Sequence, residues 1–155
     1  MNKIFLALGL GILVFAACNT TPATPTYKAI MNAANERPAL PSTVTGTATT
    51  DATLSGTTLT LKIAYTGLTG TPTLAHIHGP ADENGTAKPI CDFTSAIAAG
   101  VGATAGTGTI NTTCNLDGTA NAALTVANLD AGQLYVNLHT TANGGGEVRG
   151  QLKKQ

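Results

Sequence analysis

Charged and aromatic residues are scarce in this 155-residue chain. Only 10% of the residues are charged, the formal net charge is zero, and tryptophan is absent. No basic stretch precedes the terminal pair Lys153 and Lys154, so the chain lacks the long-range attraction that binding to a phosphate backbone requires. The composition therefore argues against nucleic acid as a partner.

The motifs of conventional hydrolases are missing as well. The sequence contains no nucleophile elbow, no paired catalytic carboxylates and no serine beside a histidine motif. Charged helical faces are rare, and the sequence is crowded with Thr, Gly and Ala, a composition that disfavours helices. We therefore expect a β protein that is not a conventional hydrolase.

The N-terminal segment is typical of an exported lipoprotein. One lysine, Lys3, precedes an apolar run over residues 4–17, which is too short for a permanent membrane span. The run ends in Phe-Ala-Ala before Cys18 and resembles the bacterial lipobox, with phenylalanine in place of the usual leucine. This predicts a signal peptide over residues 1–17 and a lipid on Cys18; the alternative is a secreted protein with a free thiol there. Asn19 favours an outer-membrane or surface anchor, because aspartate at that position favours the inner membrane.

Residues 18–26 predict a lipidated, flexible tether. They contain mainly Thr, Pro, Ala and Asn, which cannot bury a hydrophobic core. Residues 27–155 remain, enough for one domain with a core and too few for two. We expect an extracytoplasmic domain that meets the membrane only through its lipid.

Two cysteines remain when Cys18 is set aside. Cys91 and Cys114 form an even pair in a chain predicted to enter an oxidising compartment, and no Cys-x-x-Cys motif surrounds them. We predict a disulfide, worth roughly 3 kcal/mol for a loop of this length. The alternative is two reduced thiols.

Apolar and polar residues alternate with a period of two in several segments. This alternation is typical of half-buried strands and is clearest in residues 59–65 and 133–139. Together with the turn residues between the segments, it predicts an all-β fold, an antiparallel β-sandwich or Greek-key-like barrel. Residues 94–106 are rich in Ala and Gly and fit either a short helix or a loop. The shorter candidate strands are residues 27–32, 43–54, 74–78, 107–112, 120–126 and 147–152.

The three histidines of the chain lie in two strand segments. His76 and His78 are two residues apart, so in a strand they share a face at about 7 Å between Cα atoms. His139 ends another strand, on the face opposite its apolar residues and thus outward with Tyr135. Three imidazoles suit Cu, Zn or Ni, whereas the lack of carboxylate clusters argues against Ca and Mg. The alternative is that the histidines only hydrogen-bond loop backbone.

Three charged residues are candidates for contacts around such a site. Glu147 and Arg149 are two residues apart and predict an exposed ion pair worth less than about 1 kcal/mol. Alternatively, they or Glu36 orient an imidazole, since metal-bound histidines usually donate their other N–H to a carboxylate or carbonyl. Met31 is the only methionine after the signal segment, and we expect it in the core rather than on copper. Residues 143–146, Asn-Gly-Gly-Gly, predict a turn with positive φ.

Five segments of the chain form a recognisable series of motifs. They are, in order, AIMNAANERP (29–38), GL (67–68), AHIHGPA (75–81), YVNLHT (135–140) and GGEVRGQL (145–152). Together they resemble the CHRD domain family, which is named for repeats in the developmental regulator chordin and also occurs as single domains in bacterial exported proteins. The resemblance covers residues 27–152 and implies an extracellular β-sandwich, but it does not imply an established activity.

A more distant resemblance is to copper/zinc superoxide dismutase, another exported β-sandwich with a disulfide and a His-x-His strand. That resemblance implies copper on His76, His78 and His139, with Arg149 attracting an anion. No histidine lies between His78 and His139, so the bridging imidazole and the zinc ligands have no counterpart. Superoxide turnover is therefore a lesser alternative.

The sequence thus leads to two main functional hypotheses. The first is an envelope protein that binds a transition metal, with copper favoured over zinc, at the three histidines. The second is a non-catalytic module that binds a protein or surface polymer without metal. The sequence leaves open the metal, any turnover, the partner and the oligomeric state.

Overall fold

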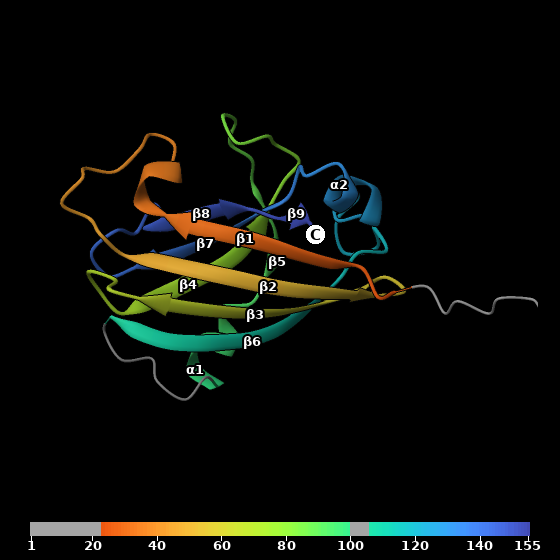
Figure 1. The fold of residues 1–155 in the computed structure, drawn as a ribbon, viewed down its shortest axis with the longest axis horizontal. Helices are drawn as coiled ribbons and strands as arrows, with labels where there is room; N and C mark the ends of the chain where they lie inside the picture. The colour runs from red at the N-terminus through yellow and green to blue at the C-terminus, as the bar shows by residue number, and fades with distance from the viewer. Residues whose placement is uncertain (1–22, 100–105) are drawn as a thin grey trace, which may run out of the picture.

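The structure is a computed structural model that describes residues 23–99 and 106–155 (Figure 1). The predicted signal peptide, Cys18 and the tether up to residue 22 lie outside the described residues. The first strand of the described residues begins at Thr26, which pairs with Thr53 in the sheet.

Nine strands of the described chain form one antiparallel sheet with the order β5-β4-β7-β8-β1-β2-β3-β6, while β9 pairs with β1. None of the helices in the described ranges is long and apolar enough to cross a membrane. The strands are β1 (Thr26–Asn32), β2 (Thr47–Ser55), β3 (Thr58–Thr66), β4 (Pro72–His78), β5 (Pro89–Asp92), β6 (Thr107–Asn115), β7 (Tyr135–Thr140), β8 (Val148–Gln151) and β9 (Lys153–Lys154). The helices are the 3-10 helix η1 (Ala33–Asn35), α1 (Ser95–Ala99) and α2 (Val126–Asp130).

The sheet curls into a nearly closed barrel (Figure 1). In the strand order, β5 and β6 are the two edges. Cys91 in β5 and Cys114 in β6 form a disulfide, with 6.4 Å between their Cα atoms. The predicted disulfide is therefore confirmed, and it links the edges of the barrel covalently.

The predicted all-β antiparallel sandwich or barrel is confirmed, and most predicted strands are present. The predicted strand over residues 120–126 is wrong. This segment is a loop that leads into α2, and the Thr125 hydroxyl caps the helix by accepting a hydrogen bond from the Asn128 N–H at 3.2 Å. Residues 94–106 include α1, and residues 100–105 lie outside the described part.

The barrel interior is apolar. In β3, alternate side chains are buried and exposed, and Leu59, Leu61 and Ile63 face inward. Met31 is fully buried in the same core, as expected, and its sulfur accepts a hydrogen bond from the Thr50 hydroxyl at 3.2 Å. β7, β8 and the end of β4 from His76 onward differ from β3 because their outer faces are buried as well.

Candidate metal site

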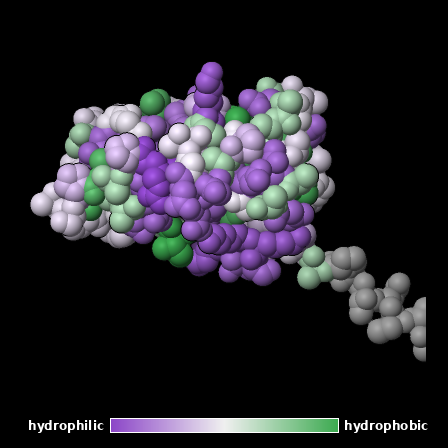
Figure 2. Space-filling model, turned by 90° about the horizontal axis from the view of Figure 1, so that it is seen from above, coloured by the Kyte–Doolittle hydropathy of each residue, from purple (hydrophilic) through white to green (hydrophobic). Residues whose placement is uncertain are grey.

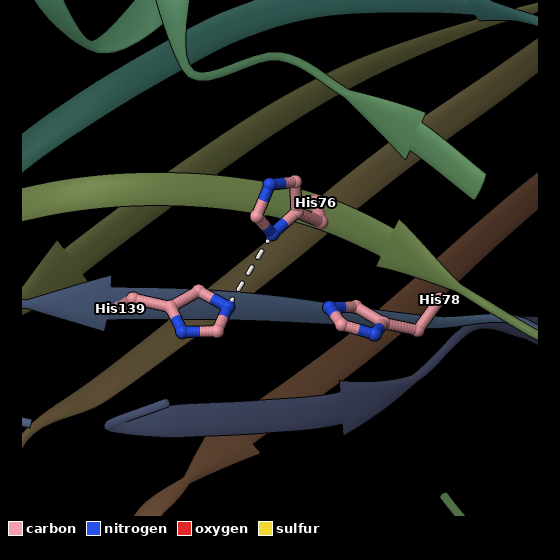
Figure 3. Close-up of side chains that lie close together, drawn as sticks. All are labelled: His76, His78 and His139. Atoms are coloured by element: carbon pink, nitrogen blue, oxygen red, sulfur yellow. Dashed lines mark hydrogen bonds between the residues drawn. The ribbon is translucent and has the colours of Figure 1, made fainter. Parts of the chain in front are cut away.

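The three histidines lie side by side on the outer face of β4 and β7 (Figure 3). β4 pairs with β7 in antiparallel register, with His76 opposite Asn137 and Leu74 opposite His139. The apolar Ala75 and Ile77 alternate with His76 and His78, and both are fully buried in the core. The site is therefore built outside the barrel wall, on the non-core side of the strands.

One nitrogen from each imidazole lies close to the nitrogens of the other two. The atoms His76 Nδ1 and His139 Nε2 are 3.3 Å apart, and ligand atoms from the three rings all lie within 4.8 Å of one another. With metal–nitrogen bonds of about 2.0–2.1 Å, two ligands of a tetrahedral ion are separated by about 3.3 Å. The spacing between His76 and His139 already meets this requirement.

The remaining imidazole nitrogens are held by acceptors. His78 Nδ1 lies 2.9 Å from the carbonyl oxygen of Ala87, and His139 Nδ1 lies 3.0 Å from that of Gly144. Since a carbonyl can only accept, both Nδ1 atoms must carry the proton. The unprotonated Nε2 atoms of these two rings are therefore free to bind a metal.

The third ring has a carboxylate near its outer nitrogen. His76 Nε2 lies 3.6 Å from Asp92 Oδ1, at the edge of β5. Because His139 Nε2 carries no proton, His76 Nδ1–H donates the 3.3 Å hydrogen bond that joins the two rings. A metal ion bound here would replace that proton, and the Asp92 carboxylate would then orient the His76 ring through its Nε2.

The site is buried rather than outward-facing. The sequence led us to expect His139 and Tyr135 on a solvent-facing surface, but His76, His78 and His139 are only 9%, 8% and 7% exposed. The loop between β4 and β5 and the turn before β8 cover this face, which the strand pattern alone cannot reveal. Burial lowers the pKa of His78 to about 4, and burial followed by the nearby His139 lowers the pKa of His76. Both rings are therefore neutral near pH 7, the state that binds metals.

Tyr135 extends the cluster. Its ring stacks on His78 with 4.9 Å between ring centroids, and the Arg149 guanidinium carbon lies 3.6 Å from the centroid of Tyr135. The Tyr135 hydroxyl accepts a hydrogen bond from the Ala87 N–H at 3.1 Å, which helps to hold the covering loop. Our sequence analysis missed Tyr135 as a contact of His78, although its alternation with His139 placed it on the correct face.

Arg149 and Glu147 do not form the predicted ion pair. Arg149 donates hydrogen bonds to the carbonyl oxygens of Asp82 and Gly85, at 3.1 and 2.8 Å. β8 begins only at Val148, so the side-chain alternation of the strand does not extend back to Glu147. The two charged groups consequently have separate partners.

Glu147 connects the loops beside the site. Its carboxylate accepts hydrogen bonds from the Thr69 N–H at 2.6 Å, the Thr140 hydroxyl at 2.6 Å and the Asn143 amide at 3.1 Å. Burial raises its pKa, but the hydrogen bonds outweigh burial and leave the pKa below the ordinary value. Gly146, with φ of 126°, confirms the predicted positive-φ turn. Glu147 is thus a fully buried anchor of this turn.

Glu36 lies behind Asn137 and not beside an imidazole. Its Oε2 accepts a hydrogen bond from the Asn137 amide at 3.3 Å, while Glu36 Oε1 is buried without a partner. Burial raises the pKa of Glu36 to about 7, against the lowering effect of Asn137 and the nearby Arg149. Asp92 is therefore the carboxylate placed next to a histidine. No sequence signal identified it, because β5 is short and contains a proline.

The comparisons with known proteins agree with the motifs. The chain matches the family model described as the CHRD domain over residues 27–152. Neither the search of curated proteins nor the search of solved structures gave a match, so the resemblance to copper/zinc superoxide dismutase stays a prediction. The family match includes His76, His78 and His139 and nearly the whole described barrel. The chain belongs to the CHRD domain family.

Proposed function

We propose that this chain is a lipid-anchored cell-envelope protein that binds one copper ion through His76, His78 and His139. The observation that carries the proposal is the grouping of the three imidazoles, whose ligand nitrogens all lie within 4.8 Å of one another. His78 Nε2 is buried with no hydrogen-bond partner in the described residues. A buried polar atom without a partner is costly, and a metal ion bound between the three nitrogens would satisfy it.

Copper is the favoured metal because the ligands are all imidazoles. Among divalent first-row metals, Cu²⁺ binds such a nitrogen site most tightly, and Zn²⁺ is the next candidate. The described residues provide three ligands in the group, which leaves a coordination position for water or another small ligand. Such a site suits copper sequestration, delivery or one-electron chemistry.

The envelope location rests on the chain's two kinds of cysteine. The lipobox-like segment before Cys18 supports lipidation, and the disulfide between Cys91 and Cys114 is consistent with an oxidising compartment. We propose an outer-membrane or surface anchor, with the tether placing the barrel outside the bilayer. Mass spectrometry of the chain from its native membrane would detect the lipid on Cys18, and a free thiol there would contradict this part of the proposal.

Metal titration of the full chain tests the copper site. The chain is prepared in non-ionic detergent with Cys18→Ser, so that no unlipidated fraction carries a free thiol that would itself bind copper. We expect one tightly bound copper ion per chain and an electron paramagnetic resonance spectrum with nitrogen coupling. A variant with His76, His78 and His139 all changed to alanine should lose both signals while circular dichroism shows an intact β fold.

Two results would contradict the copper proposal. Equal copper uptake by the parent and the triple variant would place the metal elsewhere. No uptake by a folded parent would make the histidines structural and favour the alternative, a module that binds a protein or surface polymer. Superoxide turnover should be assayed only if copper binds. It stays the lesser alternative because the chain has three histidines and lacks a fourth imidazole.

A further inference from the structure

A second polar feature lies on the same side of the molecule, beyond Arg149. It is a pocket of about 330 Å³ between the middle of β1, the end of η1 with Arg37, the loop between β4 and β5, and the C-terminal segment from β8 onward. In the view of Figure 2, from above relative to Figure 1, hydrophilic residues form a broad band that hydrophobic patches interrupt. Lys28, Arg37, Arg149 and Lys153 line the pocket together with Glu83 and Ile30.

The charges of this pocket are unbalanced. Lys28 forms an ion pair with Asp51 at 3.1 Å, and Lys153 forms one with Glu83. Arg37 donates to the backbone oxygens of Ala34 and Glu36, and no described carboxylate forms an ion pair with it. Two lysines thus have acidic partners and two arginines have none.

Arg149 is the more unusual of the two arginines. Its side chain is only 3% exposed, yet its hydrogen bonds go to backbone carbonyls, and no carboxylate in the described residues pairs with it. Burial lowers its pKa and the positive charge of Arg37 acts in the same direction, whereas Tyr135, Glu36 and Asp82 raise it. The two carboxylates offset the buried charge only at a distance, since neither forms an ion pair with it among the described residues. An anion in the pocket would provide the direct opposite charge that a buried cation needs.

The pocket also exposes an apolar surface. Ile30 is 59% exposed, the largest value among the big hydrophobic residues of the described chain. It lines the same pocket as the two arginines. A ligand that combines an anionic group with an apolar body would contact both features, whereas a small inorganic anion would use only the charges.

We propose that this pocket binds a small organic carboxylate, with the carboxylate at Arg149 and Arg37 and the apolar part against Ile30. The planar guanidinium matches a carboxylate in geometry and can bind it through two parallel hydrogen bonds. Arg149 also lies over Tyr135, which stacks on His78. The carboxylate site is thus adjacent to the histidine cluster but does not need a metal.

The test is a titration of the metal-free full chain with benzoate. The Cys18→Ser chain is treated with a chelator in non-ionic detergent, so that the carboxylate cannot bind a metal ion. Calorimetry at constant ionic strength should show saturable binding of one benzoate. Benzamide, which has the same ring without the charge, should bind at least tenfold more weakly, and so should inorganic phosphate.

Two variants locate the ligand while sparing the buried Arg149. Arg37→Gln should weaken benzoate binding by roughly tenfold, the loss of about one charge-assisted contact. Ile30→Ser should weaken benzoate more than acetate, because only benzoate has an apolar body to place there. The control Lys62→Gln removes the same charge from an exposed position on β3 outside this pocket and should leave binding unchanged.

Several outcomes would overturn the proposal. Equal binding of benzoate and benzamide would show that the charge is irrelevant, and equal binding of phosphate would reduce the pocket to a general anion site. A Lys62→Gln effect as large as that of Arg37→Gln would indicate non-specific attraction. None of these results depends on copper, so the carboxylate and metal proposals fail or succeed separately.

Discussion

The two faces of β7 are buried to nearly the same extent but by different means. On the inner face, Val136 and Leu138 are 0% exposed. On the outer face, Tyr135, Asn137 and His139 are 3%, 5% and 7% exposed. The inner face is stabilised by removal of apolar surface from water, whereas the outer face requires a hydrogen-bond partner for every polar atom.

That requirement is met only in part. The buried side-chain atoms that lack a partner in the described chain are Glu36 Oε1, His78 Nε2, Asn137 Oδ1 and Gln151 Oε1. His78, Asn137 and Gln151 belong to the outer faces of β4, β7 and β8, and Glu36 covers them through Asn137. The unpartnered groups of the described residues therefore gather around the layer to which the proposed metal site belongs.

The largest effect is expected on the inner face. Leu138→Ala should lower the free energy of unfolding by about 2–5 kcal/mol, because it removes a fully buried side chain and leaves a cavity. Copper stoichiometry of the folded fraction should stay unchanged. Denaturant unfolding measures the free energy, and a metal assay measures the copper bound per folded chain. Less than one copper ion per folded chain would show that the two faces are not independent.

A bound metal ion should stabilise the folded protein only through the histidines on the outer face. At a free metal concentration 100 times its Kd, the free energy of unfolding should rise by about 2.7 kcal/mol, and a chelator should reverse the gain. His78→Gln should abolish most of this gain, whereas Leu138→Ala should retain it. Thermal unfolding with and without copper provides the measurement. An equal rise in the free energy of unfolding of His78→Gln on adding copper would show that the metal does not bind at the histidines.

Glu36 should make stability depend on pH in the direction opposite to most carboxylates. Its pKa is raised from 4.5 to about 7 in the folded state. Its contribution is therefore present below about pH 4.5 and is lost as the pH rises through 7. Relative to the wild type, Glu36→Gln should become more stable between pH 4.5 and pH 8 by about 1–3 kcal/mol.

Glu147, another buried glutamate, should show the opposite pH dependence of stability from Glu36. Its pKa is lowered in the folded state, so its stabilising contribution is present above the unfolded pKa and is lost as the pH falls. Glu147→Gln should therefore be less stable than the wild type at neutral pH. Urea unfolding over a pH series distinguishes the two. The same pH trend for both variants would show that Glu36 is charged in the folded protein.

The smallest effect is expected for Asp92, whose side chain is 68% exposed. Asp92→Asn should weaken copper binding by about tenfold, because His76 loses the carboxylate that orients it. Stability without metal should change by less than about 1 kcal/mol. Asp51→Asn, which removes an exposed carboxylate beside Lys28, is the control and should bind copper normally. Equal affinities in both variants would mean that Asp92 does not position His76.

The sequence by itself determined the barrel wall, the disulfide partners and the candidate ligands. Residues 59–65 and 133–139 alternate with a period of two, a local property that does not depend on the rest of the chain. The spacing of His76 and His78 likewise places both rings on one face wherever the strand lies. Cys91 and Cys114 could be paired because no other cysteine remained after Cys18.

Only the tertiary structure decided what surrounds the histidines. The approach of His139 to His76, the contact of Asp92 and the cover over Tyr135 join segments that are far apart in the chain. Strand pairing and loop packing create these contacts, and a local pattern carries no information on them. For the same reason, the predicted pair of Glu147 and Arg149 was wrong: Glu147 lies just before β8 begins, and partners from distant segments hold each charged group.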